Sequence, residues 1–254
     1  MSSIQEHFKS DKNGHSNDAE QSHRDSGYSP SYGEHAVPQK PLPEKDWPMP
    51  KLRIQVADLS SPGSIEFFAN LHPTELLREA VMAVLTTLYT PENCPRHVRS
   101  VTLYIDEMGG VAHSNGSSLD DDHKEIHLST SHISNNKQRA KDEIRGVIFH
   151  EMVHCYQYNG KGKCPGGLIE GIADFVRLRA QLGPPHWKRG GSKWDEGYQT
   201  TAFFLDWLDG KFGAGTVQKI NLCMRQPYRV EIFQEVTGQS VESLWQSYKE
   251  SLGN

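Results

Sequence analysis

Two histidines four residues apart are the side chains best suited to chemistry in this 254-residue chain. They bound the segment His150-Glu151-Met152-Val153-His154. On a helix, side chains four positions apart lie on the same face one turn apart, so both imidazoles can reach a single metal ion. Glu151 lies on the neighbouring edge of that face, where its carboxylate can take a proton from a water that the metal activates.

This HExxH pattern is typical of zinc metallopeptidases, and it predicts a bound Zn²⁺ held by His150 and His154 with Glu151 as general base. The flanking residues indicate a helix over about residues 138–159. Apolar residues lead into the motif at helical spacing, and Asp142 and Glu143 place negative charge in the first turn, where the helix dipole favours it. Glycines 160 and 162 are expected to end the helix.

A third protein ligand is required, because a catalytic zinc ion keeps three side chains and leaves its fourth position to water. The next predicted helix, about residues 167–181, carries Glu170 and Asp174 on one face. One carboxylate would bind the metal, and the other would accept the spare N–H of a ligating histidine. The Glu-x-x-x-Asp spacing resembles the gluzincin arrangement, which favours Glu170 as the ligand and Asp174 as its support. The reverse assignment stays open, because Asp174 lies deeper in the helix.

Tyr198 is a further candidate, on a helix expected over residues 195–208. A phenol close to the metal can donate a hydrogen bond to the oxyanion of a tetrahedral intermediate. The alternative is that Tyr198 is a core or cleft-wall residue. Residue type and position alone do not separate these two roles.

The remaining elements predict an α+β fold with a small mixed sheet, an active-site helix packed on it, and a mainly helical C-terminal half. Residues 125–130 form a predicted strand directly before that helix. We hypothesise that this strand is the sheet edge at which a peptide substrate adds as a further strand. The other expected segments are strands at 51–58 and 98–108, a mainly helical stretch at 64–88 and a polar loop at 114–122.

The segment from Val147 to about Leu208 resembles the plant basic secretory protein family, also called peptidases of plants and bacteria. The similar stretches read HEMVHCYQYNGKGKCPGGLIEGIADFVRL and HWKRGGSKWDEGYQTTAFFLDWL, and upstream VTLYIDEMGGVAH and KEIHLS extend the resemblance over residues 50–254. The resemblance implies a zincin-like metallopeptidase domain, which we place at residues 49–254. Plant members are basic, secreted and linked to pathogen defence, whereas this chain has a net charge of -5 and a pI of about 6.2.

The N-terminal segment, residues 1–48, is polar and lacks apolar periodicity, so it is expected to be disordered. It contains no apolar run of the kind that a secretory leader requires. We therefore expect a cytoplasmic protein, with secretion by an unconventional route as the alternative. The absence of long apolar runs and the weakly acidic balance argue against membrane and nucleic-acid partners.

The expected activity is that of a zinc endopeptidase acting on a peptide or protein substrate. One alternative is a non-catalytic relative that binds zinc and acts as a binding module. Glu151 counts against that alternative, because a protein with no proton to transfer has no chemical use for a carboxylate at this position. The other alternative is a zinc hydrolase of a non-peptide amide. The sequence indicates neither the oligomeric state nor the cleavage preference.

Overall fold

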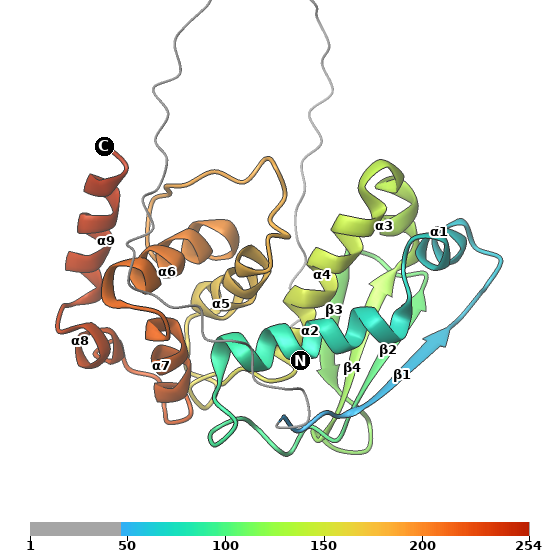
Figure 1. Cartoon of the computed structure of the whole chain (residues 1–254), viewed down its shortest axis with the longest axis horizontal. Helices are drawn as coiled ribbons and strands as arrows, with labels where there is room; N and C mark the ends of the chain where they lie inside the picture. Colours follow the sequence, from blue (N-terminus) through green and yellow to red (C-terminus); the bar gives the residue numbers. More distant parts are fainter. Residues whose placement is uncertain (1–46, 254) are drawn as a thin grey trace, which may run out of the picture.

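The computed structural model describes residues 47–253, so the predicted polar tail at 1–48 lies almost entirely outside the described residues. A four-stranded sheet forms one side of the molecule, and helices form the rest (Figure 1). The sheet order is β1-β2-β4-β3, in which the first three strands are parallel and β3 is antiparallel to β4. The strands are β1 (Lys51–Val56), β2 (Ser100–Asp106), β3 (Ala112–Gly116) and β4 (His123–Ser129).

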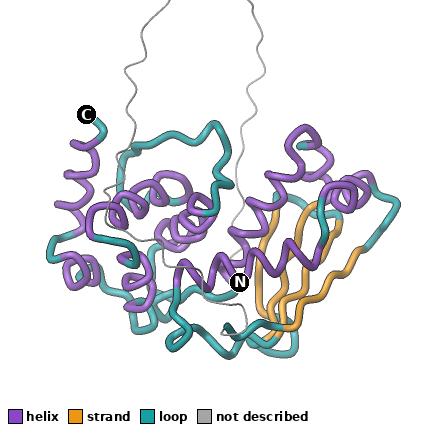
Figure 2. Tube along the Cα trace, in the orientation of Figure 1, coloured by secondary structure: helices purple, strands orange, loops and turns teal. Residues whose placement is uncertain are grey.

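The helices fall into a group beside the sheet and a group that makes up the C-terminal half (Figure 2). The first group contains α1 (Pro62–Asn70), α2 (Pro73–Leu88), α3 (Thr130–Asn135) and α4 (Ala140–His154). The second contains α5 (Gly166–Arg179), α6 (Tyr198–Phe212), α7 (Thr216–Cys223), α8 (Ile232–Thr237) and α9 (Val241–Ser251). The α+β class, the small mixed sheet and the mainly helical C-terminal half are thus confirmed.

Alternation of apolar residues along the strands decides which face of the sheet the helices cover. Leu103 and Ile105 of β2 are fully buried, as are Ile126 and Leu128 of β4. Because alternate residues of a strand point to the same face, these side chains form one apolar surface, and α2 and α4 pack over it (Figure 1). The sheet therefore supports α4, the helix that carries the HExxH motif.

The mainly helical stretch at 64–88 consists of two helices rather than one. Helix α1 ends at Asn70, and Pro73 is in the first turn of α2. Proline has no amide hydrogen to donate within a helix, but the first turn needs none, so Pro73 begins a new helix instead of continuing the old one.

The hypothesis that residues 125–130 form the sheet edge is wrong. Residues 125–129 lie in β4, which pairs with β2 on one side and with β3 on the other, and Thr130 begins α3. Strand β3 is the edge, and it occupies the start of the segment predicted to be a polar loop. Its sequence, AHSNG, shows no apolar alternation. Its strand conformation therefore comes from backbone pairing with β4 and not from burial of alternate side chains.

The active-site helix is shorter than expected, since α4 runs from Ala140 to His154. Backbone bonds from Tyr156 and Gln157 to the carbonyl of Val153 close the chain into a turn directly after the motif. Helix α6 begins at Tyr198, three positions after the predicted start at residue 195. Among the helices of residues 47–253, none has both the length and the apolar character needed to cross a membrane.

Candidate metal centre

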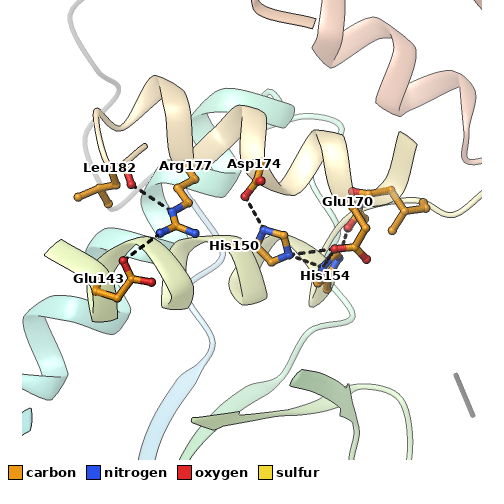
Figure 3. A network of polar contacts seen from close by, with 9 residues as sticks. Glu143, His150, His154, Glu170, Asp174, Arg177 and Leu182 are labelled. Carbon is orange, nitrogen blue, oxygen red and sulfur yellow. Dashed lines mark hydrogen bonds and ion pairs between the residues drawn. The ribbon is translucent and has the colours of Figure 1, made fainter. Parts of the chain in front are cut away.

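Helices α4 and α5 pack against each other in antiparallel directions, and polar side chains line the contact between them (Figure 3). Both helices are buried along this contact, so polar groups there must find partners across it. The facing pairs are Glu143 with Arg177, His150 with Asp174, and His154 with Glu170. The spacings are seven and four residues on α4 and three and four on α5, which are one or two helical turns and keep these pairs in register.

Three donor atoms from the two helices converge at one end of this contact. Nε2 of His150 lies 3.1 Å from Nε2 of His154 and 3.1 Å from Oε2 of Glu170. The remaining distance, between His154 Nε2 and Glu170 Oε2, is 3.6 Å. A tetrahedral zinc ion about 2.0–2.1 Å from each donor would separate its ligand atoms by roughly 3.4 Å. His150, His154 and Glu170 therefore form a group that could hold a metal ion, and the donor set suits zinc.

Asp174 contacts the other nitrogen of His150. Its Oδ1 lies 2.7 Å from Nδ1 of the ring, and its side chain is 3% exposed. A carboxylate in this place accepts the Nδ1–H, so that Nε2 is the nitrogen of His150 that a metal could bind, in place of the proton that Nε2 donates to Glu170 when no metal is bound. Burial opposes protonation of His150, but the Asp174 and Glu170 carboxylates outweigh burial and raise the pKa of His150 well above its ordinary value.

Glu170 shows the converse shift. Burial alone would raise the pKa of its carboxyl group, but hydrogen bonds and charge attraction from His150 and His154 hold that pKa well below its usual range. The carboxylate form of Glu170 is therefore favoured, and a carboxylate is the form that binds a metal.

Gln157 contacts Nδ1 of His154, as Asp174 contacts Nδ1 of His150. Its Oε1 lies 2.5 Å from Nδ1 of His154, and its Nε2 donates to the carbonyl of Ile169 at 3.0 Å. A backbone carbonyl can only accept, so the amide nitrogen must face Ile169 and the amide oxygen must face His154. It follows that His154 carries its proton on Nδ1 and that its Nε2 lone pair is available to a metal.

Sequence reasoning did not identify Gln157. The available signal was its position three residues after His154, which is within reach of that side chain at the end of a helix.

The carboxylate of Glu151 has a different environment from the other acids of the centre. The residue is only 8% exposed, yet within residues 47–253 its carboxylate forms no side-chain hydrogen bond and no ion pair. Its negative charge contributes to the raised pKa of His150, which places it electrostatically close to the centre. Its oxygens are not among the fully buried side-chain atoms that lack a partner in the described chain, so they face solvent beside the metal-binding group.

Tyr198 lies at the first position of α6 and reaches the same centre. Its ring centroid is 6.2 Å from that of His150, with 14° between the ring planes. The chain enters α6 through Gly197 at φ 102°, and Tyr198 itself has φ 45°. These positive φ values turn the start of α6 toward α5.

Small residues on α5 permit this close approach of α6. A Cβ atom on Gly171 would lie 2.2 Å from Cγ2 of Thr201, and one on Gly167 would lie 1.8 Å from the carbonyl oxygen of Asp195. The Thr201 hydroxyl also donates to the carbonyl of Trp194, which holds the entry loop of α6 in place. Glycines 167 and 171 therefore set the distance between α6 and the face that carries Glu170.

Arg177 extends the polar contact one turn beyond Asp174. Its Nε donates to the carbonyl of Leu182 at 3.1 Å, and its Nη2 lies 3.7 Å from Oε2 of Glu143. Gly146 makes room for this guanidinium, since a Cβ there would lie 2.5 Å from the Arg177 Nε. This buried ion pair fixes the register of α5 on α4, and sequence reasoning did not identify it.

The structure thus brings together His150, His154, Glu170 and Asp174, with Tyr198 beside them, on an α+β scaffold. A family model for peptidases of plants and bacteria matches residues 49–248 of the chain. The chain belongs to this family, and the membership supports peptidase activity on peptide or protein substrates. Searches of curated proteins and of solved structures each found no match.

Proposed function

We propose that this protein is a zinc-dependent endopeptidase whose metal is held by His150, His154 and Glu170. The observation that carries the proposal is the convergence of two imidazole nitrogens and one carboxylate oxygen at separations of 3.1, 3.1 and 3.6 Å. Membership of a peptidase family supports the reaction class. In this proposal Asp174 orients His150 and Gln157 orients His154.

Zinc at this position would polarise the scissile carbonyl and make a water acidic enough to be deprotonated near neutral pH. Glu151 accepts the proton of the attacking water and then delivers it to the departing amine. Tyr198 donates its phenolic hydrogen to the oxygen that gains negative charge as the carbonyl carbon becomes tetrahedral. The buried contact between α4 and α5 holds the two histidines and Glu170 in place before substrate binds, which reduces the reorganisation that the reaction requires.

The test is digestion of a mixed peptide library by purified protein in three states: as prepared, after treatment with a chelator, and after zinc is restored. Cleavage products are identified by mass spectrometry, and bound metal is measured by elemental analysis. The proposal expects about one zinc per chain, internal cleavage that the chelator abolishes, and recovery on adding zinc.

Other outcomes separate the alternative functions. Zinc binding without cleavage of any peptide would favour a non-catalytic binding module. Zinc-dependent hydrolysis of small amides without peptide cleavage would favour a non-peptide amidase. Cleavage that persists in full after complete metal removal would refute the proposed metal dependence.

A further inference from the structure

A cavity opens beside the metal centre on the side of His154. It has a volume of about 420 Å³, and its wall includes His154 and Gln157. The wall also contains residues 114–116, the end of the edge strand β3. A peptide that paired with the edge strand β3 and reached His154 would pass this cavity, whose volume is large enough for one side chain.

The charged residues of the cavity wall are mainly basic. Lys124 is buried, and its ammonium lies 2.5 Å from Oδ1 of Asp121, so this pair is neutral as a unit. Lys161 and Arg225 are also in the wall. Neither forms an ion pair with any residue of the described chain, and Asp121 is the one acidic residue in the wall. The cavity therefore carries an excess of positive charge.

Backbone pairing fixes the position of these two basic residues. Gly160 donates its N–H to the carbonyl of Met224 at 2.9 Å and accepts the N–H of Tyr228 at 3.0 Å. Gly160 has φ 61°, and a Cβ there would lie 2.4 Å from Cβ of Tyr228, so the two segments are in close contact. Lys161 follows Gly160 and Arg225 follows Met224, so the backbones of these two exposed residues lie on adjacent, hydrogen-bonded segments at the cavity.

We infer that this cavity is a specificity subsite for an acidic side chain, aspartate or glutamate, adjacent to the scissile bond. Lys161 and Arg225 supply the positive charge that attracts the carboxylate. The acidic side chain would restore charge balance to a wall that the protein itself leaves positive. This inference rests on the proposed peptidase function, because it assigns the substrate class of that same site.

The experiment uses the full-length zinc-loaded protein and pairs of fluorogenic peptides that differ by Glu or Gln at one position, scanned across the residues flanking the cleaved bond. At one position we expect kcat/KM for the Glu peptide to exceed that for the Gln peptide about tenfold, a size suited to two partly solvated cations. The ratio should decrease as NaCl rises from about 0.1 M to about 1 M. In the double variant Lys161→Gln/Arg225→Gln the ratio should fall to about one.

A matched control is the double variant Lys141→Gln/Lys219→Gln, which removes the same charge from two exposed lysines outside the cavity. It should keep the preference for Glu. Charge reversal, Lys161→Glu/Arg225→Glu, should transfer the preference to peptides with Lys at that position. Because each result is a ratio of two substrates on one enzyme, a partly unfolded variant does not imitate the effect.

Equal cleavage of the Glu and Gln peptides at every position would overturn the inference, as would a preference that survives in Lys161→Gln/Arg225→Gln. Failure of the proposed function is distinguished by measuring binding of the same peptides to the Glu151→Gln variant by fluorescence anisotropy. If no peptide is cleaved but the Glu peptide binds about tenfold more tightly through Lys161 and Arg225, the subsite stands and the peptidase assignment fails. Binding without a Glu preference removes the subsite whether or not cleavage occurs.

Discussion

Asp174 and Glu170 contact opposite nitrogens of His150: Asp174 Oδ1 is 2.7 Å from Nδ1, and Glu170 Oε2 is 3.1 Å from Nε2. From this arrangement we predict that Asp174→Asn lowers zinc affinity about 10–100-fold, the usual effect of removing a group that orients a ligating histidine. Glu170→Gln should lower it further, because it removes a ligand. Competition with a chromophoric chelator measures both.

The control for these acids is Glu235→Gln, an exposed carboxylate paired with Arg229 away from the centre, which should leave zinc affinity unchanged. If Asp174→Asn lost the metal while Glu170→Gln retained it, the two assignments would have to be exchanged.

Gln157→Met should lower zinc affinity about tenfold, because methionine keeps the length of the side chain but neither accepts from His154 nor donates to Ile169. The visible spectrum of the cobalt-substituted protein should also change, since His154 loses its fixed orientation. Gln138→Met, at an exposed position, is the matched control. Identical cobalt spectra for the two variants would contradict the role of Gln157.

Glu151→Gln should keep about one zinc per chain and reduce kcat by about 10²–10⁴, the range expected for loss of a general base. The side chain keeps its size and loses its capacity to accept the proton. His150→Ala should instead lose the metal, and elemental analysis separates the two effects. Full peptidase activity in Glu151→Gln would refute the assigned base.

Tyr198→Phe should reduce kcat by about 10²–10³ with little change in KM, because the hydroxyl acts on the oxyanion and the retained ring still forms the wall beside His150. Tyr228→Phe removes a phenol at a different site and should leave kcat near the wild-type value. If Tyr198→Phe behaved like Tyr228→Phe, Tyr198 would be a cleft-wall residue only.

The stability of the metal-free protein should depend on pH through the same centre. The pKa of His150 is raised above its ordinary value of 6.5, so its contribution to the free energy of unfolding is lost as pH rises through that raised pKa. The pKa of Glu170 is lowered from 4.5, so its contribution is lost as pH falls below that value.

Thermal unfolding between about pH 5 and about pH 9, with chelator and with excess zinc, tests this dependence. The increase in Tm on adding zinc should grow with pH, because protons compete with the metal for His150. His150→Gln, which lacks the titrating group, should not show the decrease in metal-free stability at high pH. A zinc-induced increase in Tm that shrinks as pH rises would contradict the proposed ligand set.

Local periodicity was sufficient to predict several features of this protein. His150 and His154 share a face because the helical repeat places residues four apart together, and Leu103 and Ile105 are buried because strand side chains alternate. The resemblance carried by the segment around these histidines also indicated the family, and the family match over residues 49–248 confirms it. These features depend on the order of nearby residues alone.

Only the tertiary structure decided which acid faces which nitrogen, which strand is the sheet edge, and that the carbonyl of Ile169 turns the amide oxygen of Gln157 toward His154. Glu170 and Asp174 occupy one face of α5, and the spacing favoured Glu170 as the ligand but left the reverse assignment open; the contacts of each acid follow from the antiparallel packing of α5 on α4, with Arg177 against Glu143. Strand β3 contains no apolar pattern, and its strand conformation depends on antiparallel backbone pairing with β4. The physical reason is the same in each case: the deciding contacts join segments distant in sequence, and their register is set by packing rather than by local residue spacing.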